Sequence, residues 1–228
     1  MRIFITSTNT DVGKTFVTKH LYHALKACDY DVCIFKPFQT EELADGTYPD
    51  LEVFKNECDL SYDTTSLYTF KQPVSPHLAF KMTNQTCLNK QDVFDKVSAL
   101  NEKFDFVLIE GAGGIGVPLY EGKESIYMTK DLINDCADSV ISVLPSKLGA
   151  ISDAIVHQDY MDRHVSPNNF LIMNRYTGSY IEKDNQITIG KLTNKTVYTL
   201  NEHARYEDFS EEFLQQLIGA KNELHKRT

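Results

Sequence analysis

Short, almost uniformly apolar runs alternate along the chain with longer segments in which apolar residues recur every three or four positions. A short apolar run rich in Val, Ile, Phe and Leu is typical of a strand in a parallel sheet whose two faces are both covered by helices. The sequence predicts such strands at residues 2–6, 31–36, 104–110, 139–144, 168–173 and 196–200.

The segments between these runs have the spacing of amphipathic helices. We predict helices at residues 14–28, 90–103, 126–137, 150–163 and 210–224. The stretch 40–71 is more polar and irregular, and we expect loops there with one short helix over the site. Because strands and helices alternate over the whole length, the sequence predicts a single domain at 1–228, with a doubly wound, mostly parallel α/β sheet flanked by helices.

Charge and cysteine content narrow the possible partners and the compartment. The formal net charge is -9, which argues against a nucleic-acid or anionic-membrane partner, since either needs a basic surface. A phosphate ligand remains compatible, because backbone N–H groups and a few local cations can hold it. The five cysteines form no C-x-x-C pair, and several lie in apolar runs, so we expect reduced thiols in a cytoplasmic protein. No segment is long and apolar enough for a signal peptide or a membrane span.

A phosphate-binding loop is predicted between the first strand and the first helix. Gly13 allows a close backbone approach, Lys14 can reach the β and γ oxygens of a triphosphate, and the Thr15 hydroxyl can ligate Mg²⁺. The strict pattern G-x-x-x-x-G-K-[ST] has a glycine where this chain has Thr8, so a Ser/Thr-rich turn capping an ordinary helix is the alternative. The strand-to-helix setting favours the phosphate loop.

Two other strands are predicted to end in charged side chains. Glu110 ends one of them and is followed by a glycine-rich run, which is where an acidic group meets the magnesium shell in P-loop proteins. Lys36 ends another and precedes Pro37; ligands of such sheets lie outside the carboxyl ends of the strands, where a lysine stabilises charge on a γ-phosphate. The alternatives are a buried strand ending in a flexible turn and a solvated lysine.

Together these segments resemble the dethiobiotin synthetase family. The family's G-T-D-T-x-V-G-K-T loop, its Lys-Pro and its E-G-A-G-G have counterparts at residues 7–15, 36–37 and 110–114. Its P-x-S-P-H and K-L-G segments correspond to residues 73–77 and 147–149. Two departures are Ser7 in place of the loop's first glycine, and a segment at 190–193 without the proline of the family's G-x-I-P. In the family, the segment with the proline precedes the loop that binds the nucleotide base, so the second departure concerns the selectivity for ATP over other triphosphates.

The resemblance implies an ATP- and Mg²⁺-dependent ring closure in biotin biosynthesis. One amine of 7,8-diaminononanoate takes up CO2 to give a carbamate, and ATP converts the carbamate to a carbamic–phosphoric anhydride. The second amine then expels phosphate, which leaves dethiobiotin, ADP and phosphate. The family resemblance also implies a homodimer with the diamine bound near the subunit interface.

Individual roles follow from the same resemblance. Lys14, Lys36 and Thr10 are the expected catalytic residues, and Thr15, Asp50 and Glu110 the expected Mg²⁺ ligands or their supports. The expected nucleotide-binding residues are Asp11, Val12, Gly13, Lys14, Thr15, Phe16, Asp50, Glu110, Gly111, Ala112, Gly113, Asn174 and Arg175. The expected diamine-binding residues are Thr10, Thr40, Lys147, Gly149, Ala150 and Ser152, the last four reaching the substrate carboxylate of a neighbouring subunit.

Three points remain open from the residues alone. Asn174 offers a donor and an acceptor suited to a purine edge, although a turn-forming role after a strand is the alternative. His20 and His23 lie three apart on the first helix, and packing or surface roles are favoured over a metal because no third ligand accompanies them. A P-loop small-molecule kinase and an ATPase of the ParA/MinD type are the alternative functions, the latter disfavoured because Asn9 stands where that type has its signature lysine.

Overall fold

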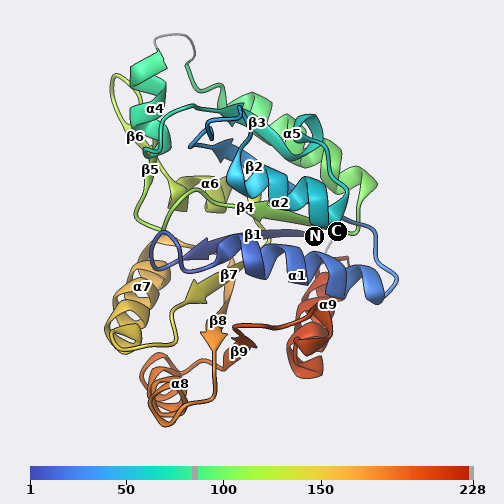
Figure 1. The fold of residues 1–228 in the computed structure, drawn as a ribbon, viewed down its shortest axis with the longest axis vertical. Helices are drawn as coiled ribbons and strands as arrows, with labels where there is room; N and C mark the ends of the chain where they lie inside the picture. The colour runs from blue at the N-terminus through green and yellow to red at the C-terminus, as the bar shows by residue number, and fades with distance from the viewer. Residues whose placement is uncertain (84–86, 226–228) are drawn as a thin grey trace.

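The computed structural model describes residues 1–83 and 87–225. Seven strands form one parallel sheet in the order β3-β2-β4-β1-β7-β8-β9, with helices on both faces (Figure 1), so the predicted fold class is confirmed. The strands are β1 (Arg2–Ser7), β2 (Val32–Gln39), β3 (Ser66–Thr69), β4 (Phe106–Glu110), β7 (Ser139–Leu144), β8 (Asn168–Tyr176) and β9 (Val197–Asn201). A separate antiparallel pair consists of β5 (Pro118–Glu121) and β6 (Ile126–Met128).

Two helical layers bury the sheet. Ile3 and Ile5 of β1 pack in one apolar cluster with helices α1 (Lys14–Ala27), α2 (Pro49–Cys58) and α9 (Glu211–His225). Phe4, which points to the opposite face, packs in a second cluster with helices of the other layer. The helices of that layer are α4 (Pro76–Thr83), α5 (Lys90–Lys103), α6 (Thr129–Cys136), α7 (Ala150–His164) and α8 (Tyr180–Thr193). Burial on both faces explains why the strands are apolar at nearly every position.

Several elements differ from the prediction. The stretch 40–71 contains more regular secondary structure than the one short helix expected, namely α2, the short helix α3 (Tyr62–Thr65) and β3. β3 is a short edge strand with alternately half-buried and exposed residues, so it lacks the apolar run used to find strands. The helix expected at 126–137 begins only at Thr129, because residues 126–128 form β6. Helices α4 and α8 were not predicted, and a 3₁₀ turn, η1 (Tyr206–Asp208), precedes α9.

The parallel arrangement brings Lys36 and Glu110 to one edge of the sheet. Glu110 ends β4 as predicted, but β2 continues through Pro37 to Gln39, so Lys36 lies inside its strand and not at the end. Ile5 of β1 pairs with Glu110 of β4, and Phe35 of β2 pairs with Ile109, so Lys36, Glu110 and the loop after β1 lie together. All seven strands belong to one sheet, which supports the single-domain prediction for residues 1–228, although that boundary stays a prediction. Among the residues described, no helix combines the length and apolar character needed to cross a lipid bilayer.

Candidate active site

The loop between β1 and α1 has the geometry of a phosphate-binding loop. Gly13 has a φ of 96° and precedes Lys14, the first residue of α1. A Cβ atom on Gly13 would lie 2.2 Å from Nδ2 of Asn174, so neither the backbone conformation nor the space admits a side chain there. The start of α1 faces the loop with backbone N–H groups that have no partner within the helix, which is an arrangement that attracts phosphate.

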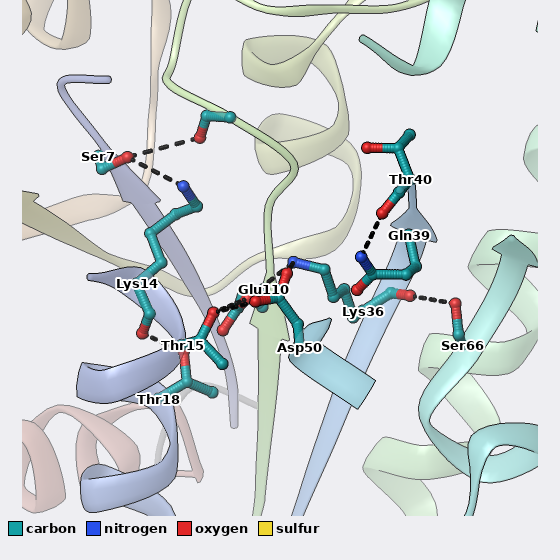
Figure 2. A network of polar contacts seen from close by, with 11 residues as sticks. Ser7, Lys14, Thr15, Thr18, Lys36, Gln39, Thr40, Asp50, Ser66 and Glu110 are labelled. Carbon is teal, nitrogen blue, oxygen red and sulfur yellow. Dashed lines mark hydrogen bonds and ion pairs between the residues drawn. The ribbon is translucent and has the colours of Figure 1, made fainter. Parts of the chain in front are cut away.

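Lys14 is buried beneath this loop. Its Nζ donates a hydrogen bond to Oγ of Ser7 at 3.3 Å (Figure 2). Burial lowers the pKa of Lys14, and the positive charge of Lys36 lowers it further, against the opposing influence of Glu110 and Asp50. Lys14 and Lys36 are therefore close enough for their charges to interact, and both line the same cavity.

A buried cluster of charged and hydroxyl groups joins β2, β4, α1 and α2 (Figure 2). Nζ of Lys36 lies 2.7 Å from Oδ2 of Asp50 and 2.8 Å from Oε1 of Glu110. Burial opposes the charge on Lys36, but the two carboxylates outweigh burial and raise its pKa above the ordinary value. The same lysine and the Thr15 hydroxyl hold the pKa of Asp50 below its usual range, although burial acts in the opposite direction.

Oxygen atoms of three residues converge next to Lys36. Oγ1 of Thr15 lies 2.8 Å from Oδ1 of Asp50 and 2.9 Å from Oε1 of Glu110, yet it has a single proton and can donate to only one of them at a time. Oε2 of Glu110 is buried and has no hydrogen-bond partner among the described residues. Hard oxygen donors with an unsatisfied carboxylate oxygen are what Mg²⁺ prefers, so these residues fit that ion.

The glycine-rich run after β4 packs against the phosphate loop. A Cβ atom on Gly114 would lie 2.9 Å from the backbone oxygen of Thr8, so the two loops can approach only because residue 114 has no side chain. The N–H of Ile115 donates to the backbone oxygen of Ser7, which fixes the same approach. Gly111, Ala112 and Gly113 therefore lie where the sequence predicts them, beside the loop.

Two neighbouring cavities open at this edge of the sheet. The first, of about 270 Å³, is lined by the phosphate loop, Lys36, Asp50 and Arg175. The second, of about 250 Å³, is lined by residues 73–76 and Val117. Five residues line both cavities: Thr10, Thr40, Glu41, Ala112 and Gly113. The site can thus hold two ligands side by side, with the predicted diamine residues Thr10 and Thr40 at the junction.

Asn174 lies against the phosphate loop. Its Nδ2 donates to the backbone oxygen of Val12 at 2.9 Å, and its buried Oδ1 has no partner among the described residues. One of the two amide N–H donors expected to meet a base is therefore already used, and the acceptor Oδ1 is free. β8 continues two residues past Asn174, and Arg175 lines the first cavity with a φ of 55°. Phe16 stacks on His20 at a centroid distance of 4.1 Å and packs partly against the core.

The predicted carboxylate-binding loop lies elsewhere in the same chain. Gly149 has a φ of 97° and precedes Ala150, the first residue of α7. Lys147, Gly149, Ala150 and Ser152 are absent from the linings of the two cavities formed by the described residues. One protomer does not bring this loop to its own site.

The histidines of α1 take part in local hydrogen bonds. Nδ1 of His20 lies 2.7 Å from the backbone oxygen of Phe16, and Nε2 of His23 lies 2.8 Å from that of Glu57. These contacts agree with the packing roles favoured for both residues.

Sequence reasoning missed Gln39, Glu41 and Val117 as cavity residues, and it assigned no role to residues 73–76. The one signal for residues 73–76 was their resemblance to the P-x-S-P-H segment of the family.

The phosphate loop between β1 and α1, together with an acidic residue at the end of β4, defines a P-loop nucleoside triphosphatase. The family model described as AAA domain matches residues 1–213. The MinD cell division protein of Aquifex aeolicus matches with a TM-score of 0.54 and 15% identity, covering 100% of this chain and 98% of that one. A plasmid partition protein of Borrelia burgdorferi matches with a TM-score of 0.55 and 13% identity, over 100% and 98% of the two chains. These likenesses show the fold alone.

Sequence relatives define the family. The ATP-dependent dethiobiotin synthetase BioD of Staphylococcus epidermidis is 62% identical over 222 residues, which cover 97% of this chain and 100% of that protein. A protein of the same name from Clostridium botulinum is 30% identical, over 94% and 96% of the two chains. The chain belongs to the ATP-dependent dethiobiotin synthetase family, and the resemblance seen in the sequence is confirmed.

Proposed function

We propose that this protein carboxylates 7,8-diaminononanoate with CO2 and closes the ring at the expense of ATP, giving dethiobiotin, ADP and phosphate in biotin biosynthesis. Membership of the dethiobiotin synthetase family supports the reaction. The observation that carries the proposal is the pair of cavities joined at Thr10 and Thr40. A triphosphate in the first cavity and a diamine carbamate in the second would meet at that junction.

The lysines suit the phosphoryl transfer. Lys14 and Lys36 would flank the transferred phosphoryl group and offset its charge, since preorganised cations stabilise charge where it develops. Bound Mg²⁺ would neutralise triphosphate charge, and Thr15, Asp50 and Glu110 would hold it. The buried, unpartnered Oε2 of Glu110 supports that assignment. Holding the second amine beside the anhydride replaces an encounter in solution, which can lower a barrier by roughly 7–11 kcal/mol.

We further infer a homodimer in which the loop at 147–152 binds the substrate carboxylate of the partner. None of the residues 147–152 lines either cavity of its own chain among the described residues. Leu148 is 96% exposed and Val156 on the following helix is 69% exposed, and such apolar groups are more stable when another copy covers them. Free N–H groups at the start of α7 would bind a carboxylate. We also infer a cytoplasmic enzyme, because all five cysteines are free.

The test is an assay of ADP release with ATP, Mg²⁺, bicarbonate and the diamine, combined with mass analysis of the product. We expect ADP release to require both the diamine and bicarbonate, and the product to have the mass of dethiobiotin. A phosphorylated diamine as the final product would indicate a small-molecule kinase. A rate of ATP hydrolysis that does not depend on the diamine would indicate a switch-type ATPase, and either result would refute the proposal.

A further inference from the structure

Glu41 adopts a backbone conformation that its side chain disfavours. Its φ is 73°, in the left-handed region that is uncommon for residues other than glycine, aspartate and asparagine. Asp29, Asp59 and Asn194 share this region, but each follows the end of a helix, where short polar side chains tolerate it. Glu41 has a long side chain and follows a strand, so helix capping does not explain it. Residues held in this way concentrate at functional sites.

The backbone around Glu41 is fixed while its carboxylate is free. The N–H of Glu41 donates to the backbone oxygen of Gln72, and the N–H of Glu42 donates to that of Lys71. The side chain of Glu42 forms an ion pair with Lys71. For the Glu41 carboxylate, no hydrogen bond or ion pair links it to another residue within 1–83 and 87–225. The backbone conformation thus serves two backbone hydrogen bonds, whereas the carboxylate of Glu41 serves no polar contact among the described residues.

Glu41 lines both cavities of the site. The second cavity otherwise consists of hydroxyl, apolar and glycine residues, so within the described chain Glu41 is the one charged residue of its wall. The first cavity, by contrast, holds the cations Lys14, Lys36 and Arg175. The wall of the first cavity also contains the carboxylates Asp11, Glu41 and Asp50, so its charges largely balance, whereas the described wall of the second cavity carries the negative charge of Glu41 alone.

We propose that Glu41 binds an ammonium group of the diamine substrate. This inference rests on the proposed function, which places the diamine in the second cavity. Aliphatic amines with a pKa of about 10, as in lysine, are cationic at neutral pH. The free carboxylate of Glu41 attracts such a substrate, and its place in the wall of the second cavity directs the amines there, away from Lys14 and Lys36. Glu41 is a binding residue, and the phosphoryl transfer itself does not require it.

Steady-state kinetics with Glu41→Gln test the proposal. The amide keeps the size of the side chain and removes its charge, so we expect the KM for the diamine to rise about tenfold, equivalent to about 1.4 kcal/mol, with the KM for ATP unchanged. Added salt should raise the diamine KM of the wild type more than that of the variant. Glu42→Gln is the matched control, because Glu42 is paired with Lys71 and lines neither cavity, and its diamine KM should equal the wild type.

A second pair of variants separates binding from folding. Glu41→Gly relieves the left-handed strain and should unfold at a higher temperature than Glu41→Ala, while both show the raised diamine KM. A structural role of the carboxylate predicts instead that Glu41→Gly unfolds at a lower temperature than the wild type, because the lost contact then outweighs the relieved strain. A wild-type diamine KM in Glu41→Gln, measured at low salt, would overturn the role of Glu41 alone. A wild type whose ADP release ignores the diamine would instead overturn the function on which it rests.

Discussion

Lys36→Ala should damage both the stability of the protein and its chemistry, and the two losses can be measured separately. Lys36 lies between Asp50 and Glu110 at distances of 2.7 and 2.8 Å. The Glu110 side chain is fully buried, so it depends on Lys36 to offset its charge. Truncation of Lys36 therefore leaves a buried carboxylate without its cation.

The structure sets the size of each loss. Removing one partner of a buried ion pair costs about 3–5 kcal/mol. For a chain of this length each kcal/mol lowers the unfolding temperature by roughly 2–4 °C, so we expect a drop of roughly 6–20 °C. Removing one charged donor from a transferring group lowers kcat by about 100- to 1000-fold.

The double variant Lys36→Ala with Glu110→Gln separates these effects. A neutral amide needs no cation, so the double variant should recover most of the unfolding temperature, measured by calorimetry without Mg²⁺ or nucleotide. Its rate of diamine-dependent ADP release should stay as low as that of Lys36→Ala, with Glu110→Gln alone as the reference for effects on the metal. The reasoning is refuted if Lys36→Ala unfolds at the wild-type temperature, or if the second substitution restores no stability.

Three further changes probe other parts of the chain. Gly13→Ala introduces a side chain at a φ of 96° and only 2.2 Å from Nδ2 of Asn174, so ATP binding measured by titration should be lost; wild-type affinity would contradict the phosphate-loop geometry. Burial lowers the pKa of His157 to about 4, so its contribution to stability is present above pH 6.5 and lost as the pH falls towards 4, a change of about 3 kcal/mol. Urea unfolding of the wild type and His157→Gln from pH 7.5 to 4.5 measures that change, and a difference independent of pH would contradict it. Leu148→Glu should give monomers in sedimentation that bind ATP but lack diamine-dependent turnover; a wild-type monomer would argue against the dimer.

Much of the phosphate half of the site could be predicted from the sequence. Its residues are tied to the apolar runs: Lys36 and Glu110 follow two of them, and Lys14 opens the helix after a third. The carboxyl ends of parallel strands meet at one edge, so the sequence predicts that Lys36 and Glu110 lie at the same edge. The adjacency of β2 and β4, which brings these residues, 74 positions apart, into hydrogen-bond contact, comes from the structure. The structure adds the hydrogen bond from Asn174 to Val12, which the sequence does not reveal because it depends on how β8 ends.

The second cavity, which we propose binds the diamine, was harder to predict from the sequence. Residues 73–76 and Val117 line the second cavity from segments without strong periodicity, and β3, which leads to residues 73–76, has an edge-strand pattern. The importance of Glu41 depends on its φ, and a glutamate in a polar stretch gives no indication of a left-handed backbone. Conformation and tertiary packing, rather than residue type, distinguish these positions from ordinary loop residues.

Thr8, which stands where the strict motif has a glycine, shows that a local sequence motif can also miss a site that the surrounding structure supports. A strict motif evaluates residues 8–15 by themselves, and by that standard the loop lacks its first glycine. In the structure, the backbone oxygen of Thr8 faces Gly114, whose Cβ would lie 2.9 Å away, and the N–H of Thr8 donates to the backbone oxygen of Val143. The loop thus keeps its path through contacts with the β4 and β7 segments. A phosphate loop is specified by the strands around it as well as by its own glycines, which is why the run after Glu110 identifies this site better than the motif alone.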